Sequence, residues 1–182
     1  MIDFDIREAL CAVIDSRHEK VRIMDELVIG KARADIVTVT DRLTGYEIKG
    51  DTDSYVRLPA QVREYDRYFQ QNCLVIGASH LKSAAEHVPA HWGIWCVCES
   101  ESGAQVQRLR EPAANPKFSI KKQLGLLWQT ELGTLLQENR LMKCAGKSKS
   151  YKRDYLLAHV PQAILARQVC EVLFERDWTV WD

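Results

Sequence analysis

Apolar residues recur along this chain with two different periods, and the period separates expected helices from expected strands. Between Asp3 and Asp15 they return every three or four positions, which predicts an amphipathic helix. Short apolar runs at 36–39, 73–77 and 92–98 predict strands, because runs of this length are typical of β-structure. The run at 73–77 has no charged residue, which favours a central strand covered on both faces.

The rest of the pattern adds further strands and helices and then becomes wholly helical. It predicts strands over 21–24 and 105–109 and helices over 59–70 and 79–87. A linker is expected at 112–116, followed by three helices over 119–139, 149–159 and 161–177. We therefore predict an α/β core over residues 1–111, with a mixed sheet flanked by helices, and a helical extension over residues 112–182.

Charged residues at fixed spacing mark the hairpin that contains the first apolar run. Asp35 opens the run, a polar turn is expected at 41–45, and the next strand carries Glu47 and Lys49. Side chains alternate across a strand, so Glu47 and Lys49 share one face. Opposed residues of an antiparallel pair also share a face, and a connection with an odd number of residues brings Asp35 there. We expect the two carboxylates to approach within about 4–6 Å, close enough to share a cation.

Two carboxylates and a lysine in one place match the chemistry of phosphodiester hydrolysis. Carboxylates hold divalent cations, which polarise a phosphate and lower the pKa of an attacking water. A lysine orients that water and offsets charge that develops on phosphorus. The residues resemble the PD-(D/E)XK nuclease superfamily, with Asp35 as the aspartate, Glu47-Ile48-Lys49 as the (D/E)XK motif, and Ala34 in place of the proline. The alternative is a hairpin whose Glu–Lys pair is an ordinary surface ion pair.

A second motif lies in the helix expected over 59–70. Gln61 and Tyr65 are four residues apart and stack on one helical face. This QxxxY spacing after (D/E)XK resembles the RecB and lambda-exonuclease branch of the superfamily. The run GYEIKGDTD…RLPAQVREYDRYF is also similar to a family of small bacterial proteins with that core, and the resemblance covers residues 5–77.

The resemblance implies a restriction-endonuclease-like fold and a role for each motif residue. Asp35 and Glu47 would hold Mg²⁺ or Mn²⁺, and Lys49 would activate water. Gln61 and Tyr65 would face the metal site and the nucleic acid.

Members of the superfamily often carry another acid upstream of the first aspartate. Glu26 is the best placed residue for a third metal ligand, with Glu19 and Glu8 as competitors and an ordinary surface acid as the alternative. Arg7 either faces nucleic acid or is a solvated surface arginine.

Composition and residue spacing argue against a membrane protein and against iron–sulfur and zinc sites. The chain has 182 residues and no net charge, and no run approaches the ~20 apolar residues of a membrane helix. The N-terminus has no signal-peptide pattern, so we expect a cytoplasmic protein that does not contact a membrane. The six cysteines form no CxxC motif and lack the spacing of an iron–sulfur site, and the histidines do not suggest zinc.

Charge is separated along the chain. Between Lys117 and Arg153, nine basic residues stand against two acidic ones, a net charge of +7, whereas residues 1–116 carry −4. A phosphate backbone is the natural partner of such a segment, because a solvated helical face normally mixes both signs. The expected nucleic-acid contacts are Lys143, Lys147, Lys149, Lys152 and Arg153.

These observations predict a Mg²⁺- or Mn²⁺-dependent nuclease with DNA as the expected substrate. The alternative is a non-catalytic nucleic-acid-binding or regulatory protein on the same fold. A toxin or phage-defence component would have the same biochemistry as the nuclease. The sequence leaves open the choice between exonuclease and endonuclease, between DNA and RNA, and between a monomer and a homo-oligomer.

Overall fold

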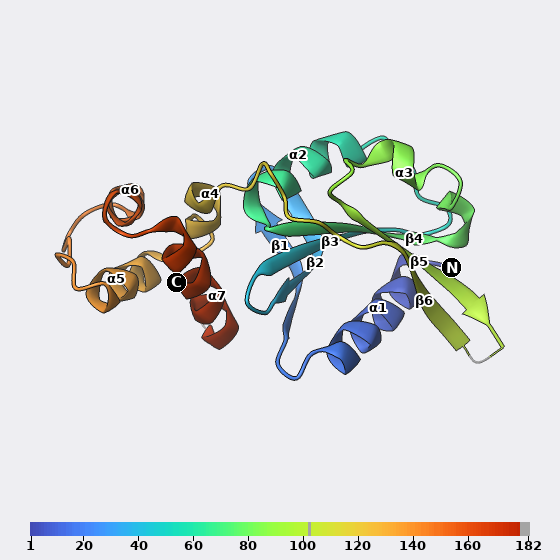
Figure 1. Cartoon of the computed structure of the whole chain (residues 1–182), viewed down its shortest axis with the longest axis horizontal. Helices are drawn as coiled ribbons and strands as arrows, with labels where there is room; N and C mark the ends of the chain where they lie inside the picture. The colour runs from blue at the N-terminus through green and yellow to red at the C-terminus, as the bar shows by residue number, and fades with distance from the viewer. Residues whose placement is uncertain (102, 179–182) are drawn as a thin grey trace. The chain divides into compact units, whose positions relative to one another are not determined.

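The chain divides into two compact units, Met1–Phe118 (unit 1) and Ser119–Asp182 (unit 2), in the computed structural model (Figure 1). The structure describes residues 1–101 and 103–178; positions 179–182 of the predicted extension lie outside them. The segment after the sheet belongs to unit 1, because Asn115 Nδ2 donates hydrogen bonds to the main-chain oxygens of Asp66 (2.8 Å) and Phe69 (2.7 Å).

A six-stranded mixed sheet forms the centre of unit 1 (Figure 1). Its strands lie in chain order: β1 (Arg22–Ile29), β2 (Ala32–Val39), β3 (Leu43–Lys49), β4 (Gln71–Gly77), β5 (Gly93–Ser100) and β6 (Gly103–Arg110). β4 runs parallel to β3 and to β5, and the other neighbouring strands are antiparallel. β4 is central and almost wholly buried, as the sequence predicted, and β6 is a largely exposed edge strand.

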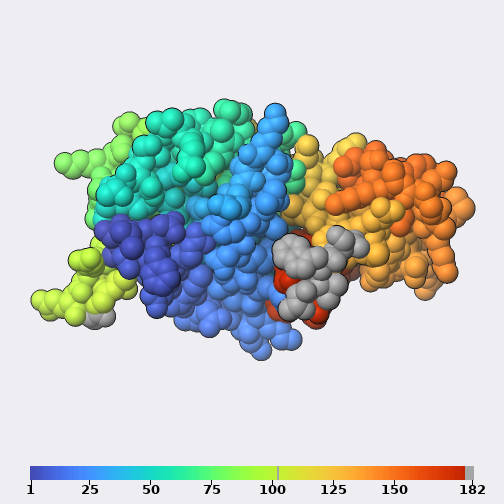
Figure 2. All heavy atoms as spheres, turned by 180° about the vertical axis from the view of Figure 1, so that it is seen from behind, coloured from blue at the N-terminus to red at the C-terminus, as the bar shows by residue number. Residues whose placement is uncertain are grey.

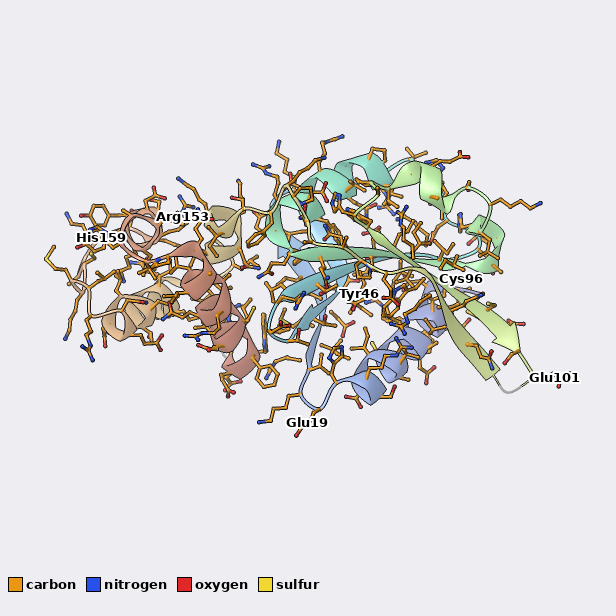
Figure 3. The ribbon with its side chains drawn as sticks, viewed as in Figure 1. Glu19, Tyr46, Cys96, Glu101, Arg153 and His159 are labelled. Atoms are coloured by element: carbon orange, nitrogen blue, oxygen red, sulfur yellow. The ribbon has the colours of Figure 1, made fainter. Side chains whose placement is uncertain are left out.

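Two helices cover opposite faces of this sheet, α1 (Asp3–Arg17) and α2 (Leu58–Tyr68) (Figure 1). The buried stripe of α1 consists of Ile6, Leu10 and Ile14 and packs on Tyr46 and Ile48 of β3 in the main apolar core. Side chains fill the space between α1 and the sheet around Tyr46 (Figure 3). Neighbouring residues of β3 therefore point toward α2, because strand side chains alternate.

Unit 2 contains four helices among the described residues. They are α4 (Ile120–Leu124), α5 (Gln129–Glu138), α6 (Lys149–His159) and α7 (Gln162–Glu175). Arg176, after α7, donates to both carboxylate oxygens of Glu131 at 2.7 and 2.5 Å. The guanidinium also lies between the rings of Trp128 and Trp178, 4.5 and 4.7 Å from their centroids. This buried pair ties the end of α7 to the start of α5.

Three local predictions are wrong. The β2–β3 connection is the three-residue segment 40–42 and not 41–45, because Val39 already pairs with Leu43. The expected helix over 79–87 is a 3₁₀ turn, η1 (Ala78–His80), and a short helix, α3 (Ala84–His87). The helix over 119–139 is divided into α4 and α5, because Trp128 is extended and caps α5 by donating its N–H to the Glu131 carboxylate at 2.6 Å.

The predicted fold class is confirmed: a mixed α/β sheet flanked by helices, with a helical segment at the C-terminal end. Trp92 and Trp95 are buried. Within residues 1–101 and 103–178, no helix has the length and apolar character needed to cross a membrane.

Candidate functional site

The three charged hairpin residues lie on the face of the sheet that α2 covers. Ile36 pairs with Tyr46 across β2 and β3, and Asp35 and Glu47 are the next positions along the two strands in the same register. The shorter connection still has an odd number of residues, and the parity expected from sequence is therefore preserved. Asp35, Glu47 and Lys49 all line one cleft of about 1090 Å³.

The lining of this cleft comes from segments that are distant in sequence. Asp3 belongs to α1, Lys31 to the β1–β2 turn, and Ala32, Arg33 and Asp35 to β2. The remaining lining residues belong to β3, the loop at 52–57 and α2. Figure 2 shows the face of unit 1 on which α1 (dark blue), the β1–β2 hairpin (blue) and α2 (teal) adjoin.

Glycine 45 allows α2 to approach the sheet closely at this point. A Cβ on Gly45 would lie 2.3 Å from the Phe69 ring and 2.8 Å from the Tyr65 ring. No side chain fits in that space. Gly45 was expected at the end of the turn at 41–45, whereas it lies inside β3 and is needed for packing. The close approach brings Tyr65 against the motif residues.

Glu47 and Lys49 form a buried ion pair at the base of the cleft. Lys49 Nζ lies 2.6 Å from Glu47 Oε1 and donates a hydrogen bond to Gln61 Oε1 at 3.3 Å. Glu47 and Lys49 are only 1% and 4% exposed, which rules out a solvated surface pair. Burial of a charge is costly without a partner, so the two side chains hold each other and Gln61 in a fixed arrangement.

Tyr65 joins the two carboxylate-bearing strands. Its hydroxyl donates toward Glu47 Oε2 at 2.9 Å and toward the Tyr46 main-chain oxygen at 3.1 Å. The same hydroxyl accepts a hydrogen bond from Asp35 N at 3.2 Å. The side chain is fully buried, and burial raises its pKa well above the usual value. Tyr65 therefore contacts the neighbouring motif residues and does not itself line the cleft.

Asp35 is half-buried beside another acid, Glu47. Its Oδ2 accepts a hydrogen bond from Ile48 N at 2.8 Å. Burial, and then the charge of Glu47, raise the pKa of Asp35 to about 7, although the Ile48 N–H and Lys49 oppose the shift. Burial also raises the pKa of Glu47 in spite of Lys49. Lys49 alone therefore does not offset the burial of the two carboxyl groups, and a bound cation would supply further positive charge.

The donor set fits Mg²⁺ or Mn²⁺. Mg²⁺ keeps several waters and is commonly held by one or two carboxylates together with phosphate oxygens. Asp35 and Glu47 supply the two carboxylates, and each ionised oxygen has lone pairs beyond those used in the hydrogen bonds above. No cluster of three or more acidic, histidine or cysteine side chains suited to a metal occurs among the described residues.

Glu26, the expected third ligand, is not brought to this cleft. It has a positive φ of 57° in β1, and its carboxylate pairs with Arg33 and, at 3.3 Å, with Arg7. Arg7 also donates to the main-chain oxygen of Asp35 at 2.7 Å, so this arginine supports the motif strand and is not a free surface cation. The acid that lines the cleft from the N-terminal side is Asp3, which the sequence reasoning missed.

The Tyr65 hydroxyl supplies a first test of this arrangement. Tyr65→Phe removes one donor and leaves Asp35 N and Glu47 Oε2 buried with fewer partners. We expect a loss of about 1–3 kcal/mol in the free energy of unfolding, measured by urea denaturation. Tyr151→Phe, on an exposed position of α6, is the control and should leave stability within about 0.5 kcal/mol of the wild type. If Tyr65→Phe is as stable as the wild type, the hydrogen bonds of the Tyr65 hydroxyl do not stabilise the contact between β2 and β3.

The five predicted nucleic-acid contacts lie in unit 2, in the segment before α6 and on α6 itself, where Figure 3 labels Arg153. Lys143, Lys147 and Lys149 are exposed, and the Lys147 amine lies 5.2 Å from the Tyr151 ring centroid. Lys152 and Arg153 are half-buried and already engaged: Lys152 donates to Gln129 O at 3.3 Å, and Arg153 pairs with Asp154 at 3.2 Å.

The fold and the cleft together define an α/β protein with paired carboxylates and a lysine beside a mixed sheet. The family model described as "Bacteriophage P4 protein cII" matches residues 5–178, and the chain belongs to this family.

Two known proteins are similar to parts of this chain. Protein cII of Enterobacteria phage P4 is 22% identical over 139 residues, covering 72% of this chain and 53% of that protein. The chain therefore spans about half the length of this curated relative. Among solved structures, Pyrococcus furiosus SfsA in complex with Ca²⁺ is similar over 60% of this chain and 61% of its own, with 18% identity and a TM-score of 0.32.

Proposed function

We propose that unit 1 is a metal-dependent nuclease of the PD-(D/E)XK type that hydrolyses phosphodiester bonds, with DNA as the expected substrate. The observation that carries the proposal is the meeting of Asp35, Glu47 and Lys49 in one cleft, with the Glu47–Lys49 pair almost wholly buried. A buried pair beside a second carboxylate is costly to maintain for stability alone, which favours a functional role.

Each motif residue has a distinct role in the proposal. Asp35 and Glu47 would hold Mg²⁺ or Mn²⁺, which when bound polarises a phosphate and acidifies a water. The Lys49 ammonium, fixed by Glu47 and Gln61, would donate hydrogen bonds to the attacking water or a phosphate oxygen. Tyr65 is a positioning residue, because its hydroxyl bonds Glu47 and the Asp35 main chain. In place of Glu26, the proposal uses Asp3 as an additional acid, which lines the cleft together with Asp53 and Glu64.

Unit 2 would add a second contact with nucleic acid. Lys143 and Lys147 are exposed and have no ion pair within the described residues, so their charges are available to phosphates. Lys149 is also exposed, whereas Lys152 and Arg153 would have to exchange their present partners. The family relationship is compatible with this role but does not specify a ligand.

A substrate panel tests the proposal directly. Linear and circular, single- and double-stranded DNA and RNA are incubated with the full chain in Mg²⁺, Mn²⁺ or EDTA, and the products are separated on gels. We expect cleavage of DNA with either metal and none in EDTA. Cleavage that persists in excess EDTA would exclude the metal mechanism. Binding without cleavage under all conditions would favour the alternative, a non-catalytic nucleic-acid-binding protein.

A further inference from the structure

Three positive side chains that line the cleft have no carboxylate partner. Lys31 lies in the β1–β2 turn, Arg57 precedes α2, and Arg63 lies on α2. All three are exposed, and no ion pair among the described residues involves them. Arg33 and Arg67 line the same cleft but pair with Glu26 and Glu64. The unpaired cations come from two separate elements that meet at one cavity.

The cleft is also more positive than the unit that surrounds it. Its lining contains six basic and five acidic side chains, a net charge of +1, whereas unit 1 as a whole has 15 basic and 18 acidic residues, a net charge of −3. Two of the five acids are Asp35 and Glu47, whose charge a divalent cation would offset. Positive charge is therefore concentrated where the motif residues lie, and an anionic ligand is favoured there over the rest of unit 1.

The size and depth of the cleft limit what can enter. Its volume of about 1090 Å³ equals that of a cube roughly 10 Å on each side, near the upper end of small-ligand sites. A DNA duplex is wider than its own major groove, which is about 12 Å across, so a whole duplex does not fit inside a cleft of this size and would lie across its opening. Glu47 and Lys49 are recessed and almost wholly buried, so a phosphate must enter the cleft to meet them. A chain of a few unpaired nucleotides satisfies both requirements.

The cleft lining indicates how such a strand would be held. No aromatic side chain is among the described residues that line it, so bases have no ring to stack on. Proteins that bind single strands through stacking place aromatic residues along the groove. Contacts here would instead be made to phosphates, which all sequences share.

We propose that this cleft binds a single-stranded segment of nucleic acid through its phosphates, with Lys31, Arg57 and Arg63 as the contacting cations. The proposal rests on the proposed nuclease function and names the substrate class: free single strands or unpaired ends, and not the interior of a duplex. Arg57 and Arg63 reach the strand from α2 and the residue before it, and Lys31 reaches it from the β1–β2 turn. Binding would be strongly salt-dependent and would show little preference among bases.

The test measures binding of the full chain to fluorescent 12-nucleotide single strands and to a 12-base-pair duplex, by anisotropy over a range of salt concentrations. Ca²⁺ replaces Mg²⁺ during binding, and substrate integrity is checked on a gel. In the triple variant Lys31→Gln, Arg57→Gln, Arg63→Gln we expect single-strand affinity to fall at least about 10-fold at low salt. The log–log salt slope should flatten by roughly 2, since each single-strand contact contributes about 0.7.

A matched control uses Lys20→Gln with Lys82→Gln, two exposed cations of unit 1 that do not line the cleft. This control should bind as the wild type does, and thermal melts of all variants establish that they are folded. An unchanged affinity and salt slope in the triple variant would overturn the proposal, as would equally tight binding of duplex with the same dependence on these three residues.

The outcome is separable from that of the nuclease proposal. If the wild type binds single strands through Lys31, Arg57 and Arg63 but cleaves nothing with Mg²⁺ or Mn²⁺, the binding inference stands and the nuclease proposal fails. If the wild type cleaves duplex interiors and the triple variant cleaves them equally well, the nuclease proposal stands and the single-strand inference fails.

Discussion

Asp35→Asn is expected to lower the rate of DNA cleavage at saturating Mg²⁺ by about 1,000-fold or more, because it removes one of two carboxylates proposed to hold the metal. The amide oxygen can still accept the hydrogen bond that Ile48 N donates to Asp35 Oδ2 at 2.8 Å, so the hairpin should keep its shape. Initial rates with a labelled oligonucleotide give the measurement, and circular dichroism verifies the fold.

Lys49→Gln is the companion variant. Glutamine keeps a donor for the buried Glu47 oxygen but lacks the ammonium charge, so a similar loss of rate is expected. Truncation to alanine is a poorer test, because it would leave Glu47 buried without its ion-pair partner.

The control for both variants is Asp41→Asn. Asp41 lies in the β2–β3 connection of the same hairpin, where it is exposed and pairs with its neighbour Arg42. Its cleavage rate should match that of the wild type. Full activity in Asp35→Asn or Lys49→Gln would show that these side chains are not the reactive groups.

The free energy of unfolding should fall as the pH rises from about 4 to 7, and Asp35 should be a main cause. The pKa of Asp35 is about 7 in the folded chain, against a usual value near 3.8. Between these pH values the folded state holds a proton that the unfolded chain has released, so stability falls as pH rises. Ionisation of Asp35 in the folded chain lowers the free energy of unfolding by as much as about 4 kcal/mol, and this decrease is complete only above pH 7.

Asp35→Asn should therefore be more stable than wild type at pH 8 by up to about 4 kcal/mol, with a much smaller difference at pH 4. Urea denaturation in EDTA at the two pH values measures both differences. Asp41→Asn is again the control: Arg42 lowers the pKa of Asp41, so its removal should give no gain at pH 8. If the difference in the free energy of unfolding between Asp35→Asn and the wild type does not change with pH, the raised pKa of Asp35 is contradicted.

Mg²⁺ should reduce the difference in the free energy of unfolding between Asp35→Asn and the wild type at pH 8. A cation bound by Asp35 and Glu47 stabilises only the folded chain with both carboxylates, so wild type should gain stability at pH 8 as Mg²⁺ rises. Asp35→Asn should gain far less. This comparison detects metal binding without any measurement of activity.

Several features of the site are properties of short stretches, and the sequence alone was sufficient to predict them. Glu47 and Lys49 share a face because strand side chains alternate, and Asp35 joins them whenever the connection has an odd number of residues. For that reason, the error in the length of the connection did not alter the prediction. Likewise, Gln61 and Tyr65 share a helical face because they are four residues apart.

The wholly apolar run in β4 also predicted its central place in the sheet. The mixed α/β fold class followed from the same local periods, since each period sets which face of an element must be buried.

Only the tertiary structure decided how these side chains are used. Tyr65 is removed from solvent because Gly45 lets α2 pack closely on β3, a contact between residues far apart in sequence. Glu26 is paired with Arg33 of the neighbouring strand β2 and with Arg7, whose approach depends on how α1 packs against the sheet. The cations Lys31, Arg57 and Arg63 look like ordinary surface residues in the sequence and line one cleft only when the β1–β2 turn meets α2. Local periodicity fixes the face on which a side chain lies, whereas its partners and its exposure depend on the packing of distant segments.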